Sequence, residues 1–128
     1  MEKCEHIGIA VKSLAVSVPL FEKLLNSKCY KTELVEGENV NTAFLRTGET
    51  KIELLESTEP DGVIAHFNKK KGEGIHHIAI KVENLEKHLE KLDNNDIILI
   101  DKEPKTGANN KRIAFVHPKS TSGVLLEL

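Results

Sequence analysis

Two histidines and two glutamates occupy matching places in the two halves of this sequence. His6 stands near the start of EHIGIAVK, and His77 stands at the same place in the similar segment IHHIAIKV. Glu53 lies inside KIELLE, 47 positions after His6, and Glu127 lies inside VLLEL, 50 positions after His77. Imidazole nitrogens and carboxylate oxygens bind divalent transition metals. Together the four side chains would suit one zinc, cobalt, nickel or manganese ion.

Each of these residues has an ordinary explanation when it is taken alone. A single histidine at the start of a strand is more often packed or solvated than bound to a metal. A single glutamate among apolar neighbours often pairs with a lysine. The ordinary explanation must hold twice here, at the same places of a repeat. We therefore favour a metal site in which the four residues meet around an axis of approximate symmetry.

The elements around these residues repeat as well. Each half begins with a short apolar run, 6–11 and 77–82, which predicts a largely buried strand. Apolar residues at helical spacing follow Ser13 in the first half and Asn84 in the second, and both residue types cap helices. Short strand-like runs complete each half: 30–35, 40–46 and 51–55 in the first, and 97–100, 112–116 and 124–128 in the second.

This repeat predicts an α+β fold of two βαβββ modules in one chain. We place the first module at about 1–58, a linker helix at about 59–73 and the second module at about 74–128. Gly48 and Gly123 suit hairpin turns before the last strand of each module. A chain of 128 residues is long enough for one domain and too short for two ordinary ones. We expect a single domain, with neither half stable alone.

The composition argues against several classes of protein. The formal net charge is only −2, whereas a nucleic-acid-binding face would show a basic excess. No apolar run approaches the length of about 20 residues that spans a bilayer, and the N-terminus lacks the segments of a signal peptide. Cys4 and Cys29 are too few for a disulfide framework and form no C-x-x-C pair. We expect a cytoplasmic protein with reduced cysteines that binds neither nucleic acid nor membrane.

The remaining histidines receive other assignments. His76 immediately precedes His77, and the alternation of side chains along a strand predicts it on the opposite face, in a packing or supporting role. His66 and His88 fall on predicted helices and should be solvated. His117 belongs with a segment near the C-terminus.

That segment, NNKRIAFVHPKSTSG at 109–123, places hydrogen-bond donors near the open edge of the second module. They would suit a carboxylate or the phosphates of coenzyme A: Lys111, Arg112, Lys119 and Ser120. Residue by residue, an ordinary solvated surface explains them equally well. The sequence contains no P-loop and no G-x-G-x-x-G motif, so we expect no loop that cradles a nucleotide.

Several longer segments resemble a known family: HIGIAVKSL, TKIELLE, GEGIHHIAIKV, KRIAFVHPKS and GVLLEL. They are similar to the vicinal oxygen chelate superfamily, which includes the glyoxalases and bleomycin resistance proteins, and within it to the methylmalonyl-CoA epimerases. The resemblance covers almost the whole chain in order and spacing. It implies paired βαβββ modules whose sheet curves around a metal cleft. It also implies a metal held by residues matching His6, Glu53, His77 and Glu127, although some members have glutamine where Glu53 stands.

The resemblance implies an isomerase that removes a proton from C2 of an acyl-CoA and returns it to the other face. A metal would stabilise the enolate charge, and a base and an acid would face C2 from opposite sides. Glu127 is the first candidate for proton transfer and Glu53 the second. Alternatively both only hold the metal, and another group moves the proton.

Two other functions remain open at this point. A lactoylglutathione lyase would use the same ligands on a glutathione adduct, and a metal-free resistance protein would only bind a small molecule. The segment EGENVNT at 36–42 departs from the epimerase pattern, and in the family it borders the substrate. It therefore bears on the acyl group and on the second acid. The internal symmetry predicts a homodimer.

Overall fold

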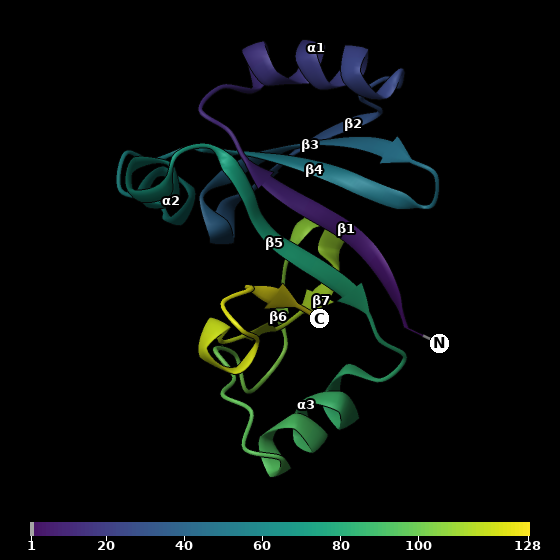
Figure 1. The fold of residues 1–128 in the computed structure, drawn as a ribbon, viewed down its shortest axis with the longest axis vertical. Coiled ribbons are helices and arrows are strands. Elements are labelled where there is room, and N and C mark those ends of the chain that lie inside the picture. Colours follow the sequence, from purple (N-terminus) through teal and green to yellow (C-terminus); the bar gives the residue numbers. More distant parts are fainter. Residues whose placement is uncertain (1) are drawn as a thin grey trace.

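The computed structural model describes residues 2–128, which form a mixed seven-stranded sheet with helices against it (Figure 1). The strand order is β2-β3-β4-β1-β5-β9-β8. The first module supplies β1 (Lys3–Ala10), β2 (Lys31–Val35), β3 (Val40–Thr47) and β4 (Thr50–Ser57). The second supplies β5 (Gly74–Lys81), β8 (Phe115–Val116) and β9 (Leu126–Glu127). Its β6 (Lys105–Thr106) and β7 (Arg112–Ile113) form a separate two-stranded sheet.

The helices are α1 (Leu14–Leu25), α2 (Val63–Lys71) and α3 (Leu85–Asn94), with short 3₁₀ turns η1 (Glu36–Glu38), η2 (Ala108–Asn110) and η3 (Pro118–Ser120). Both predicted caps are confirmed: Val16 N donates to Ser13 Oγ at 3.4 Å, and Lys87 N donates to Asn84 Oδ1 at 3.0 Å. Within residues 2–128, no helix is long and apolar enough to cross a membrane.

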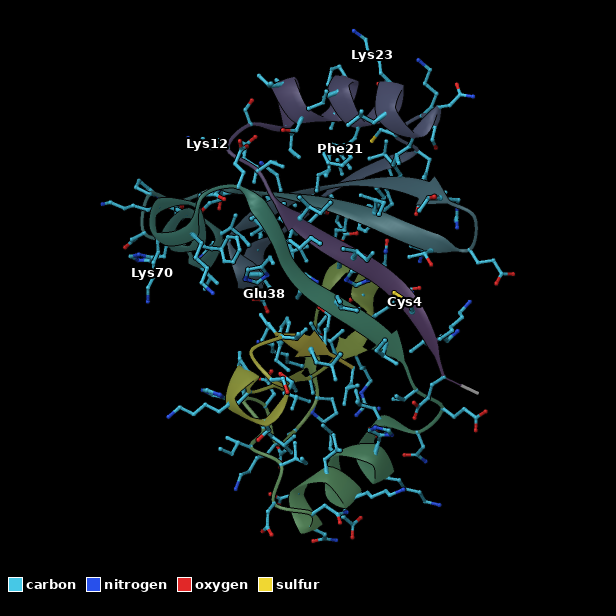
Figure 2. All side chains as sticks on the ribbon, viewed as in Figure 1. Cys4, Lys12, Phe21, Lys23, Glu38 and Lys70 are labelled. Atoms are coloured by element: carbon cyan, nitrogen blue, oxygen red, sulfur yellow. The ribbon has the colours of Figure 1, made fainter. Side chains whose placement is uncertain are left out.

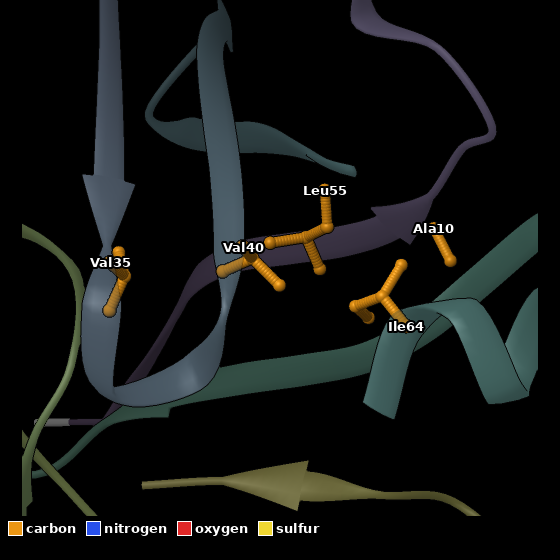
Figure 3. Packing of buried hydrophobic residues seen from close by; sticks show 5 residues of the cluster. All are labelled: Ala10, Val35, Val40, Leu55 and Ile64. Atoms are coloured by element: carbon orange, nitrogen blue, oxygen red, sulfur yellow. The ribbon is translucent and has the colours of Figure 1, made fainter. Parts of the chain in front are cut away.

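A separate apolar cluster lies beneath each helix. Figure 2 shows Phe21 of α1 directed toward the sheet and Lys23 directed away from it. The cluster under α1 contains Val11, Ala43, Leu45, Ile52 and Leu54. The cluster beside α2 contains Ala10, Val35, Val40, Leu55 and Ile64 (Figure 3). The cluster at α3 contains Leu89, Ala114, Val116 and Leu128. The helices are thus fixed by packing, and the strands between them are held in place.

The second module is less regular than predicted. The run 97–100 forms no strand and contributes only a bridge between Leu99 and Val116. The run 112–116 divides into β7 and β8, and 124–128 shortens to Leu126–Glu127. Side chains take over ladder positions here: Ile98 N donates to Ser120 Oγ, and Phe115 N donates to Asp101 Oδ2, each at 2.9 Å. These bonds offer the backbone an alternative to the sheet ladder.

The two modules join where β1 and β5 pair as antiparallel neighbours (Figure 1). The register sets Gly8 opposite His77 and Ala79 opposite His6. A Cβ added to Gly8 would overlap the His77 imidazole. Glycine is needed at this position because the partner strand's side chain lies directly over the backbone.

Gly8→Ala should therefore lower the free energy of unfolding by about 1–3 kcal/mol, because the His77 ring must move or the strands must separate. Urea unfolding of the metal-free protein measures this change. Gly37→Ala is the matched control, since a Cβ at Gly37 meets nothing within 4 Å. Equal stability of the two variants would contradict the close approach.

Candidate metal centre

Neighbouring strands position the four predicted ligands. In each module the first and last strands are parallel neighbours, β1 beside β4 and β5 beside β9. The first strand carries the histidine and the last carries the glutamate. Because β1 and β5 are also paired, His6, Glu53, His77 and Glu127 meet at the middle of the sheet. All four are buried, and none exposes more than 7% of its surface.

The side chains face one another at short distances. Nε2 of His6 lies 3.0 Å from Nε2 of His77, and the two rings are nearly perpendicular, at 86°. Nε2 of His6 also lies 3.2 Å from Oε2 of Glu53 and 3.5 Å from Oε2 of Glu127. Nε2 of His77 lies 3.4 Å from Oε1 of Glu127. Both histidines therefore direct the same ring nitrogen toward the carboxylates.

These atoms fit a divalent ion. Two nitrogens that share one ion at about 2 Å lie about 3 Å apart, as the two Nε2 atoms do. His6, His77 and Glu127 offer ligand atoms that all lie within 4.8 Å of one another. Oε2 of Glu53 is buried and forms no hydrogen bond with any described residue, which leaves an acceptor that a cation would satisfy. The donors suit the predicted metal, with Glu53 as its proposed fourth ligand.

Burial sets the electrostatics of the cluster. It raises the pKa of Glu53 to about 7 and, together with the nearby charge of Glu53, raises the pKa of Glu127 to about 8. Burial lowers the pKa of His6 and lowers that of His77 to about 3. The imidazoles are therefore neutral at physiological pH, with a lone pair free for coordination. Nearby lysines lower the carboxylate pKa values, Lys51 and Lys111 for Glu53 and Lys105 for Glu127, but burial outweighs them.

The cluster opens into a cavity of about 440 Å³ lined by both modules. Besides the four predicted ligands, its walls include the apolar side chains beside α2, namely Val35, Val40, Leu55 and Ile64. The second module adds Ile80, Val82, Leu85, Ile113, Phe115 and Leu128. Polar groups at the centre and apolar walls on both sides are typical of a small-molecule site.

The predicted substrate-binding residues separate into two groups. Lys111 and Arg112 line the cavity. Lys111 Nζ lies 3.3 Å from Glu5 Oε1, and Arg112 pairs with Glu86. Lys119 and Ser120 are not among the described residues that line the cavity. Ser120 instead accepts a hydrogen bond from Ile98 N. Binding of substrate by any of these four residues remains a prediction.

Two residues that line the cavity do not follow the alternation of side chains that a regular strand shows. Glu5 and His76 line the same cavity as the histidines that follow them, so the predicted opposite face for His76 is wrong. The β1–β5 register explains this, because it skips one residue at each place: Glu5 in β1 and His76 in β5 have no partner across the ladder. A β-bulge of this kind re-aims side chains next to a site. The sequence offered one signal, since Glu5 matches His76 in the repeat.

The other histidines lie apart from the cluster. His88 on α3 pairs with Glu2, at 3.6 Å between Nδ1 and Oε1. Nδ1 of His117 accepts a hydrogen bond from Lys119 N at the start of η3. His66 lies on α2. None of these three histidines is among the described residues that line the cavity.

The chain belongs to the Glyoxalase/Bleomycin resistance protein/Dioxygenase superfamily, whose family model matches residues 5–115. Its fold is glyoxalase-like, as predicted, with a mixed sheet and three helices across the described residues. Within the superfamily it is similar to proteins named methylmalonyl-CoA epimerases. The human mitochondrial enzyme of that name is 34% identical over 127 residues, which cover 98% of this chain and 72% of the relative.

The chain is also similar to a second protein in sequence and to a solved structure. An uncharacterized protein of Bacillus subtilis is 41% identical over 128 residues, covering 100% of this chain and 91% of the relative. A solved structure of a Streptomyces coelicolor methylmalonyl-CoA epimerase variant, in complex with 2-nitronate-propionyl-CoA, superposes with a TM-score of 0.91. It is 31% identical, and the match covers 98% of this chain and 92% of that one.

The carboxylate pKa values predict how stability depends on pH. The pKa values of Glu53 and Glu127 in the folded protein, about 7 and about 8, exceed the ordinary value of 4.5. Their contribution to stability is therefore full below pH 4.5 and is lost as pH rises through the folded values. The pKa values of His6 and His77 are lowered from 6.5, so these two histidines change the stability only below about pH 6.5. Between about pH 6.5 and about pH 8.5, the metal-free protein should lose stability.

Urea unfolding in a chelating buffer checks this. Saturating cobalt should reduce the loss, because a cation favours the ionised carboxylates. Stability that stays constant or rises over the same range would contradict the raised pKa values.

Proposed function

We propose that the protein is a metal-dependent epimerase of methylmalonyl-CoA or a close acyl-CoA. One observation supports the proposal most directly. Two neutral imidazoles and two buried carboxylates face one another inside a cavity, and one carboxylate oxygen is left without a hydrogen bond. The relatives named methylmalonyl-CoA epimerases support the substrate class, as does the acyl-CoA analogue in the Streptomyces structure.

His6, His77, Glu127 and Glu53 would hold the ion. When bound, it would polarise the thioester oxygen and stabilise the negative charge of the enolate, an effect worth several kcal/mol. The neutral state of both imidazoles suits this role, because only a deprotonated nitrogen can coordinate.

The two carboxylates would carry the proton. Glu127 takes the C2 proton onto a carboxylate oxygen, and the electron pair of the C–H bond moves into the enolate. Glu53, on the strand related to β9 by the internal repeat, returns a proton to C2 from the other face and so inverts the centre. Both carboxylates are buried beside the predicted ion, and a cation there would favour the ionised form that Glu127 needs to accept the proton.

The cavity wall would bind the charged parts of the substrate. Lys111 lines the cavity and leaves nearly half of its side chain exposed, 45%, despite its contact with Glu5. An ammonium group there would attract a substrate carboxylate or a phosphate. Lys119 and Ser120 lie farther along the same segment and would act on a more distant part of the ligand.

Proton exchange distinguishes this function from its alternatives. In heavy water the protein with cobalt should incorporate deuterium at C2 of methylmalonyl-CoA, because epimerisation passes through loss of that proton. Mass spectrometry of the thioester measures the uptake, and chelated protein is the control. Turnover of a glutathione hemithioacetal without C2 exchange would identify a lactoylglutathione lyase instead. Absence of both activities, with no bound metal, would favour a small-molecule-binding protein.

Glu127→Gln separates binding of the metal from transfer of the proton. The amide oxygen can still coordinate, so some cobalt should remain, but an amide is no base. Exchange at C2 should fall by about 10²–10⁴-fold. His77→Ala should lose metal and activity together because it removes a ligand. Exchange at the parent rate in Glu127→Gln would assign Glu127 to metal binding alone and leave Glu53→Gln as the next variant to test.

A further inference from the structure

Each histidine of the metal centre has a second partner at its outer ring nitrogen. Nδ1 of His6 lies 3.3 Å from Oε1 of Glu5, and Nδ1 of His77 lies 2.9 Å from Nδ1 of His76. In both cases the partner is the residue immediately before the histidine. In both cases it occupies the unpaired position of a β-bulge between β1 and β5.

The bulges make these contacts possible. In a regular strand, consecutive side chains point to opposite faces, so the residue before a buried histidine would face away from it. The extra residue of a bulge re-aims one side chain, and two consecutive side chains then reach the same cavity. The same distortion appears at the same place in both modules, although the residue types, carboxylate and imidazole, differ.

Both partners are themselves held in place. Oε1 of Glu5 also accepts a hydrogen bond from Lys51 Nζ and forms an ion pair with Lys111 Nζ, each at 3.3 Å. The ring of His76 packs edge-on against Phe67 of α2, with 5.1 Å between centroids. A partner whose own position is fixed can fix the orientation of the ring that it contacts.

We propose that Glu5 and His76 are positioning residues, each accepting the Nδ1 hydrogen of the following histidine so that its Nε2 lone pair faces the metal. The inference rests on the proposed metal centre. An imidazole that coordinates through Nε2 carries its hydrogen on Nδ1. An acceptor at Nδ1 selects this tautomer, fixes the ring and makes the ligand more basic. Glu5 accepts with a carboxylate oxygen, and His76 accepts with the lone pair of its own Nδ1.

Paired substitutions separate this role from simple packing. Glu5→Met and His76→Phe keep the approximate size but remove the acceptor. Glu5→Gln and His76→Asn keep an acceptor oxygen, and in asparagine that oxygen lies close to the place of histidine Nδ1. Titration with cobalt, followed through its visible absorption bands, measures affinity and coordination without any substrate. Melting of the chelated variants confirms that each is folded.

Cobalt affinity should fall by about 10–100-fold in Glu5→Met and His76→Phe and should recover largely in Glu5→Gln and His76→Asn. Glu5→Gln also serves as the control for the lost ion pairs of Glu5, because it removes the charge and keeps the acceptor. Parent-like affinity in the acceptor-free variants would overturn the proposal. So would equally weak binding in the acceptor-retaining variants, because packing alone would then explain the loss. A parent protein that binds no cobalt would overturn the metal centre and this role together.

Discussion

The antiparallel pairing of β1 with β5 is the contact on which the rest of the site depends. Each module carries only one histidine and one glutamate of the cluster, and neither pair alone resembles a metal site. The pairing brings Nε2 of His6 to within 3.0 Å of Nε2 of His77. It requires glycine at position 8, because the His77 ring occupies the space of a Cβ. The parallel pairing of β1 with β4 and of β5 with β9 then adds the two carboxylates.

This arrangement lowers the stability of the metal-free fold. Four polar side chains are buried at the middle of the sheet, and one carboxylate oxygen forms no hydrogen bond with a described residue. Burying such groups is unfavourable unless each finds a partner. The apolar clusters beneath α1, α2 and α3 offset this cost, and those at α2 and α3 also form part of the cavity wall. A functional site often lowers the stability locally, and the packing of the rest of the fold compensates for this loss.

Patterns confined to a single element could be read from the sequence, whereas effects of register could not. The caps at Ser13 and Asn84, the turn at Gly48 and the strands of the first module depend on local spacing, and the structure bears them out. The position of His76 depends on a bulge that appears only when two strands are paired. The run 97–100 has the composition of a strand and keeps two backbone hydrogen bonds to 115–117. The side chains of Ser120 and Asp101 accept the hydrogen bonds of two further backbone N–H groups, and the ladder goes no further. The repeat predicted that the four side chains would meet because it compares two strands at once, which a single pattern cannot do.

The two modules carry matching histidines and glutamates at the site, but the residues around these four side chains differ. Glu5 corresponds to His76 in the repeat, and Gly8 corresponds to Ala79. The residues next to the predicted ligands therefore differ between the modules, whereas the predicted ligands match. An epimerase must work in both directions, because its acid in one direction is its base in the other. The two carboxylates proposed for these roles are both buried, and they stand on strands that correspond in the repeat. Approximate symmetry thus suits the proposed reaction, because it places one carboxylate from each module beside the same buried histidine nitrogen.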